Sequence, residues 1–141
     1  MSETLTPQGA IIYLMVVTAA SDGKMDDSEL RTIGRVVRSF PLFSEADESR
    51  LVRTAEDCGQ LMASNGGLQK VMDLAGRSIP NHLGETAYAA VIDVVTADEA
   101  LDPAELRILE MVRDTLSISD DGASAIERAA RARHMTAEPV D

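Results

Sequence analysis

The chain has 141 residues, 45% of them hydrophobic and 26% charged, with a formal charge of −11 and a single cysteine, Cys58. The acidic surplus argues against nucleic-acid binding, which needs a basic face to displace counterions, and against docking on anionic lipid. One cysteine excludes an internal disulfide framework and favours a reducing compartment. The apolar run at residues 10–20 is too short to span a membrane and follows no basic segment. We therefore expect a cytoplasmic protein that does not insert into membranes.

Turn and capping residues divide the chain into seven predicted helices. Thr6 followed by Pro7 is typical of a helix start, and the "SNGG" at 64–67 is typical of a break. No segment shows the alternation of a strand. The predicted fold class is all-α, in a single domain over residues 1–141. The approximate helix ranges are 7–21, 26–39, 44–63, 68–78, 80–97, 102–116 and 119–135.

An acidic phrase occurs twice. "DGKMDDSELR" begins at Asp22 and "DEALDPAELR" begins at Asp98, and both read D-x-x-x-D-x-x-E-L-R at an offset of 98 − 22 = 76 residues. Apolar residues on helical spacing match at the same offset. The matching pairs are Ile12 and Tyr88, Met15 and Val91, Val16 and Ile92, Ala19 and Val95, Leu30 and Leu106, Ile33 and Leu109, Val36 and Val112, and Phe40 and Leu116.

Each copy is then a helix pair with one apolar stripe, and one such pair cannot bury its stripe alone. The pattern predicts a pseudo-symmetric bundle of two repeats, at about 7–40 and 83–116. The helical insert at 44–79 and the C-terminal helix at 119–135 are expected to cover the flanks.

Helix capping explains part of the acidic phrase. Asp26 and Asp102 stand at predicted N-cap positions, with Glu29 and Glu105 three residues on, which is the spacing of a capping box. Capping does not explain Asp22 and Asp98, because each lies near the C-terminal end of the preceding helix, where a carboxylate is mildly unfavourable.

Metal binding is the second interpretation of these acids. If the two turns approach each other, their carboxylates repel unless a cation compensates them, and hard oxygen ligands suit Ca²⁺, Mg²⁺ or Mn²⁺. Glu99, Asp27 and Asp93 would add to the cluster. Zinc does not fit, because no Cys or His shows ligand spacing, and the phrase lacks the spacing of an EF-hand. The candidate ligands are Asp22, Asp26, Glu29, Asp98, Asp102 and Glu105.

The sequence carries no catalytic motif. It lacks a nucleophile elbow, a Cys–His signature, a P-loop and a dinucleotide fingerprint, so we expect a non-enzymatic protein. A protein partner is the other expectation. The stripe in the third predicted helix forms either core or a partner groove, and Cys58 within it reads as a small buried residue. That stripe consists of Leu51, Val52, Ala55, Cys58, Leu61 and Met62.

The two segments "AASDGKMDDSELRTI" and "VVTADEALDPAELRIL" resemble the TerB tellurite-resistance family, which is related to the N-terminal domain of the DnaJ-like co-chaperones. This resemblance implies a duplicated all-helical bundle, a role in tellurite or chemical-stress resistance, and metal binding at the acidic residues. It also implies an interaction module rather than an enzyme. The sequence departs from the family pattern at Glu99, where copy one has Gly23. A metal-independent adaptor or a co-chaperone-type docking domain is the alternative.

Overall fold

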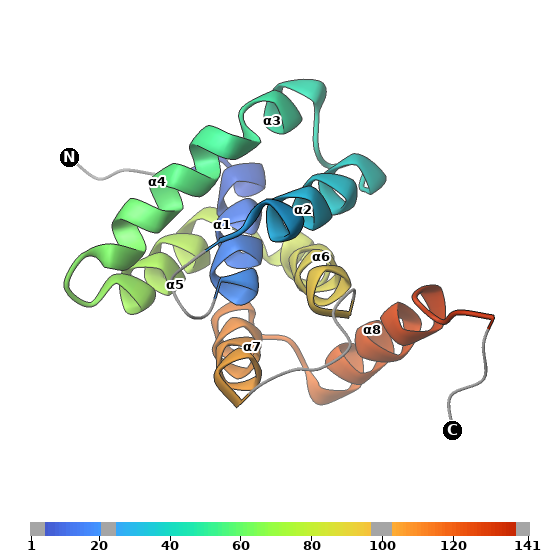
Figure 1. Ribbon diagram of the computed structural model, residues 1–141. Coiled ribbons are helices and arrows are strands. Elements are labelled where there is room, and N and C mark those ends of the chain that lie inside the picture. Colours follow the sequence, from blue (N-terminus) through green and yellow to red (C-terminus); the bar gives the residue numbers. More distant parts are fainter. Residues whose placement is uncertain (1–4, 21–24, 97–102, 138–141) are drawn as a thin grey trace.

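The structure is a computed structural model that describes residues 5–20, 25–96 and 103–137, and these residues are helical with no strand (Figure 1). The all-α prediction is confirmed, and the described residues contain one α-helix more than the seven that the sequence predicted. The described residues form eight α-helices and one 3₁₀ turn. These are α1 (Pro7–Ala19), α2 (Asp27–Ser39), α3 (Glu45–Ser49), α4 (Leu51–Ala63), α5 (Gly67–Ser78), η1 (Asn81–Leu83), α6 (Gly84–Thr96), α7 (Pro103–Leu116) and α8 (Asp120–Arg133).

Helix α1 is the centre of the bundle. Every residue from Ala10 to Thr18 is buried, and α1 packs against α2, α4, α5, α6 and α7. Its sequence "AIIYLMVVT" has no polar face, and a helix that is apolar all round is stable only inside a core. The repeat predicts one buried stripe on this helix, which underestimates how much of its surface is buried. Helices α4 and α5 cover the sides that α6 and α7 leave open.

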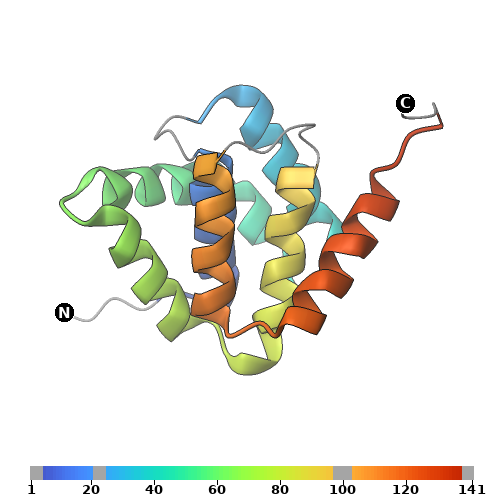
Figure 2. The ribbon, with the colours of Figure 1, turned by 90° about the horizontal axis from the view of Figure 1, so that it is seen from below.

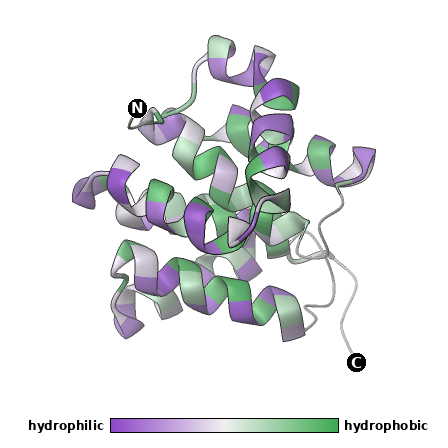
Figure 3. Cartoon of the chain, turned by 90° about the vertical axis from the view of Figure 1, so that its left-hand side faces the viewer, coloured by the Kyte–Doolittle hydropathy of each residue, from purple (hydrophilic) through white to green (hydrophobic). Residues whose placement is uncertain are grey.

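Helix α6 is the second buried helix, and Ala90 to Val95 are all buried within it. Helices α7 and α8 lie on either side of it (Figure 2). The insert and the last helix cover the flanks as predicted, with α4 and α5 packed on α1 and α8 on α6. The outer helices mix hydrophilic and hydrophobic positions along their length, as expected of helices with one buried face (Figure 3).

The predicted repeat corresponds to a regular offset between elements. Helices α6 and α7 begin 77 (84 − 7) and 76 (103 − 27) residues after α1 and α2. The cross-contacts also correspond, because α1 packs on α7 and α2 packs on α6. One matched position departs from the predicted stripe: Leu106 is 47% exposed, whereas Leu109 and Val112 on the same helix are buried. The offset and the cross-contacts agree with pseudo-symmetry, which itself stays a prediction.

The predicted helix 44–63 is two helices. Ser44 caps α3 as expected, but Arg50 leaves the helical conformation, with φ −97° and ψ 7°. Arg is a good helix former, so local sequence gives no sign of this break. The packing explains it: α3 has no buried residue, whereas the turn at Arg50 brings Leu51 into the core and aligns α4 with α1.

The "SNGG" break has a clear backbone cause. Gly66 adopts the left-handed conformation with φ 68°, which a residue with a Cβ adopts only at a cost. A Cβ on the next residue, Gly67, would lie 2.3 Å from the carbonyl oxygen of Met62. Two consecutive glycines are therefore required for the chain to turn from α4 into α5.

Candidate functional site

Three of the six predicted metal ligands belong to the described part of the structure. Asp26 is the N-cap of α2, and Glu29 and Glu105 lie in the first turns of α2 and α7. The other three, Asp22, Asp98 and Asp102, lie outside the described residues.

Glu29 and Glu105 line one pocket of about 210 Å³. They occupy equivalent positions of the two acidic phrases, 105 − 29 = 76 residues apart. Ser28, Thr32 and Arg35 supply the rest of the polar lining, and apolar residues of α1 and α6 complete the wall. The starts of α2 and α7 thus converge on one place, and one acidic residue from each phrase lines the same small volume.

The capping box of the first copy is present. The Asp26 backbone N–H donates to Glu29 Oε1 at 3.1 Å, and the Glu29 N–H donates to Asp26 Oδ1 at 2.8 Å. These two hydrogen bonds satisfy backbone donors that the first turn of a helix leaves unpaired. The capping prediction is confirmed for Asp26 and Glu29, and both side chains therefore have a structural role whatever else they bind.

The donors that line the pocket suit a hard cation. Carboxylate and hydroxyl oxygens are the ligands that Mg²⁺, Ca²⁺ and Mn²⁺ prefer, and the described residues that line the pocket supply no sulfur or imidazole. Arg35 is the competing cation on the same wall, and its Nη2 donates to Thr32 Oγ1 at 3.4 Å. The described residues alone contain no group of three or more His, Cys, Asp or Glu side chains that could hold a metal ion.

Asp93 does not join this cluster, and the expectation that it would was wrong. It is buried, 8% exposed, and its Oδ1 lies 2.6 Å from Arg133 Nη2 and 3.4 Å from His134 Nε2. Its carboxylate is therefore directed to the end of α8. Sequence reasoning missed this ion pair, because the two partners lie 40 residues apart and belong to no motif.

A cavity of about 870 Å³ lies between α7 and α8, with α6 as its floor. Inside it, Tyr88 Oη donates to Glu127 Oε2 at 2.5 Å. Burial raises the pKa of Tyr88 above its ordinary value, and the Glu127 carboxylate raises that pKa further. Arg113, also on this wall, pairs with Asp120 at 2.7 Å. Much of the charge around this cavity is thus bound in internal pairs, which favours a structural role for it.

Cys58 is fully buried, and its Sγ contacts the carbonyl oxygen of Tyr13 at 3.7 Å. Burial raises the pKa of its thiol to about 12. A thiol with this pKa remains protonated at neutral pH and is a poor nucleophile. The interpretation of Cys58 as a small core residue is therefore confirmed.

The helices that the structure describes are all too short or too polar to cross a membrane. A family model described as tellurite resistance protein TerB matches residues 8–129. Searches of curated proteins and of solved structures gave no match. The matched range covers both helix pairs, the insert between them and most of α8, so the chain belongs to the TerB tellurite-resistance family.

Proposed function

We propose that this protein is a non-enzymatic TerB module of a tellurite or chemical-stress response, and that it binds one divalent cation between its two acidic helix starts. Family membership suggests the link to tellurite resistance. The observation that carries the cation site is the common pocket of Glu29 and Glu105. Asp22, Asp98 and Asp102 are proposed as further ligands from their places in the two phrases.

Charge is the physical reason for a cation there. Two acidic residues line a volume of about 210 Å³, in a chain that carries a formal charge of −11. The positive ends of two helices offset part of this negative charge. Arg35 on the same wall offsets another part, and a divalent cation would bring two positive charges and take oxygens of both residues as ligands.

The competing function is a metal-independent adaptor in which the same acids only cap helices. Glu29→Gln distinguishes the cation-binding function from the metal-independent one. Glutamine can also cap the helix from the third position of a capping box, but it lacks the negative charge of glutamate. The hydrogen bond to the Asp26 backbone N–H is kept, and a cation ligand is lost. Asp47→Asn is the matched control, since Asp47 completes the same kind of capping box at the start of α3.

The experiment is thermal unfolding of chelator-treated protein, titrated separately with Mg²⁺, Ca²⁺ and Mn²⁺. A ligand present at a hundred times its Kd adds about 2.7 kcal/mol to the free energy of unfolding. We expect one of these ions to raise the Tm of the wild type and of Asp47→Asn. The same ion should leave the Tm of Glu29→Gln and of Glu105→Gln unchanged. Equal Tm shifts in all four proteins, or a shift in none, would leave the adaptor as the function.

A further inference from the structure

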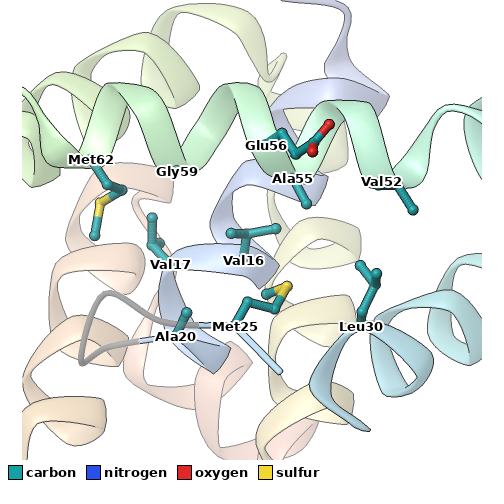
Figure 4. Close-up of a pocket in the computed structure, with 10 residues that line it drawn as sticks. All are labelled: Val16, Val17, Ala20, Met25, Leu30, Val52, Ala55, Glu56, Gly59 and Met62. Carbon is teal, nitrogen blue, oxygen red and sulfur yellow. The ribbon is translucent and has the colours of Figure 1, made fainter. Parts of the chain in front are cut away.

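A second cavity lies beside the first acidic turn, in an apolar groove between α4 and the start of α2 (Figure 4). Its volume is about 230 Å³. Val16, Val17 and Ala20 of the α1 segment form its floor, and the wall residues come from α4 and from the segment around Met25 and Leu30. On α4 these wall residues are Val52, Ala55, Glu56, Gly59 and Met62.

The predicted stripe of α4 therefore divides in two. Leu51 and Cys58 point into the core and are buried. Val52, Ala55 and Met62 line the groove instead, and Val52 is 56% exposed. An exposed aliphatic side chain beside a preformed apolar groove is the arrangement of a binding surface, whereas isolated exposed apolar residues are ordinary.

The volume decides what class of ligand fits. Pockets for drug-sized molecules and cofactors span roughly 300–1,000 Å³, so this groove is too small for them. It is large enough for one large apolar side chain, such as the anchor residue of a helix laid in a groove. Two of its lining residues are methionines, whose flexible side chains adapt to different anchors.

Charge decides what surrounds the anchor. Among the described residues that line the groove, Glu56 is the one with a charge, and it forms no ion pair with any other described residue. The chain has a formal charge of −11, which repels acidic partners and a second copy of itself. A basic residue one helical turn from the anchor would meet Glu56.

We propose that this groove binds a partner protein through an amphipathic helix, with one large apolar anchor side chain in the groove and a lysine or arginine against Glu56. The groove is a cavity separate from the proposed cation site, although Met25 and Leu30 belong to the first acidic phrase. The groove and the pocket of Glu29 and Glu105 have no lining residue in common. Loss of one activity therefore leaves the other measurable.

The test uses the full chain and a synthetic Ala-based helical peptide that carries one Phe flanked by Lys residues. Its binding is followed by NMR of methyl-labelled methionines. Met25 and Met62 line the groove, while Met15 and Met72 are buried in the core and serve as internal references. We expect saturable shifts of the Met25 and Met62 methyl signals alone. A matched peptide with Glu in place of each Lys should bind several-fold more weakly.

Three variants sharpen the result. A Cβ built at Gly59 meets no atom within 4 Å, so Gly59→Leu can fill the groove without a backbone clash and should abolish binding. Val52→Asp, at an exposed position, should also abolish peptide binding, and it serves as the test if Gly59→Leu folds poorly. Glu56→Lys should weaken binding of the Lys peptide roughly fivefold. Asp57→Lys is its matched control, because Asp57 is exposed but does not line the groove.

Several outcomes would overturn the proposal. Absence of any shift, equal binding of the Lys and Glu peptides, or shifts that persist in Gly59→Leu would each exclude this mode of docking. Met25 and Met62 signals that move with protein concentration and are not displaced by the peptide would identify a second copy as the occupant instead.

Discussion

Arg133 Nη2 lies 2.6 Å from Asp93 Oδ1, and this ion pair joins the last turn of α8 to the buried side of α6. His134 Nε2 lies 3.4 Å from the same oxygen. The buried residues of α8 are two alanines, Ala123 and Ala130, which bury little apolar area. Polar contacts to α6 therefore add to the apolar packing of Ile126, which is partly buried against the core, in holding α8 in place.

Arg133→Gln should loosen α8 before the rest of the bundle. Arg133 is about half exposed, so the pair contributes on the order of 1 kcal/mol rather than the larger value of a buried pair. Native-state hydrogen exchange should accelerate in α8 while α1 stays protected. Arg128→Gln is the control, since Arg128 is exposed on the same helix. Equal acceleration in both variants would show that the ion pair does not hold the helix.

Cys58 makes stability depend on alkaline pH. Its thiol has an ordinary pKa of 9.0 and a folded-state pKa of about 12. Above about pH 9 the unfolded chain loses this proton first, so the free energy of unfolding falls as pH rises toward the folded pKa. Tyr88, whose pKa is also raised, adds to the fall above pH 10. Urea unfolding at about pH 8 and about pH 10 should give a smaller decrease for Cys58→Ala than for the wild type, and equal decreases would contradict this account.

The capping box at the start of α2 predicts different costs for its two acids. Asp26→Ala removes the acceptor of the Glu29 N–H hydrogen bond and should lower stability by about 1 kcal/mol. Glu29→Gln should cost far less, because glutamine can accept the Asp26 N–H hydrogen bond. Denaturant unfolding in the presence of chelator measures both. A loss in Glu29→Gln as large as that in Asp26→Ala would mean that the charge of Glu29, not its cap hydrogen bond, stabilises the fold.

Substitution by alanine should change the stability of the protein in opposite directions at two glycines, Gly59 and Gly67. Gly59 lies inside α4, where a Cβ meets nothing, so Gly59→Ala should stabilise the protein by up to about 1 kcal/mol. Gly67→Ala should destabilise it, because the new Cβ would lie 2.3 Å from the Met62 carbonyl oxygen. For a domain of this size, 1 kcal/mol corresponds to a Tm change of about 3 °C. Similar Tm values for the two variants would contradict the described turn between α4 and α5.

Local signals in the sequence predicted most of the helices. Thr6 Oγ1 accepts the Gly9 N–H hydrogen bond, and Ser119 Oγ accepts that of Gly122, so the predicted starts of α1 and α8 are confirmed. Such caps can be read from sequence because their partners lie within one turn. The break at Arg50 could not be predicted, since it depends on how α4 packs against α1 and not on the residues around it.

The sequence predicted only part of the candidate site, because the rest depends on how helices distant in the sequence pack together. The duplicated phrase identified Glu29 and Glu105 as equivalent, but sequence could not decide whether their turns approach each other or lie at opposite ends. That depends on the packing of α2 and α7 around the two central helices. Asp93 was misplaced because its partner, Arg133, comes from the last helix and shares no sequence pattern with it.

The shared cation site is tested most directly by adding one equivalent of Mn²⁺ to isotope-labelled protein and recording the paramagnetic broadening of its amide signals. Because the proposed site places one ion between both acidic starts, signals at the beginning of α2 and of α7 should broaden together, and either Glu29→Gln or Glu105→Gln should abolish both effects. Broadening at one helix start only, or an effect at each start that is lost only in that start's own variant, would contradict a site shared by the two helices.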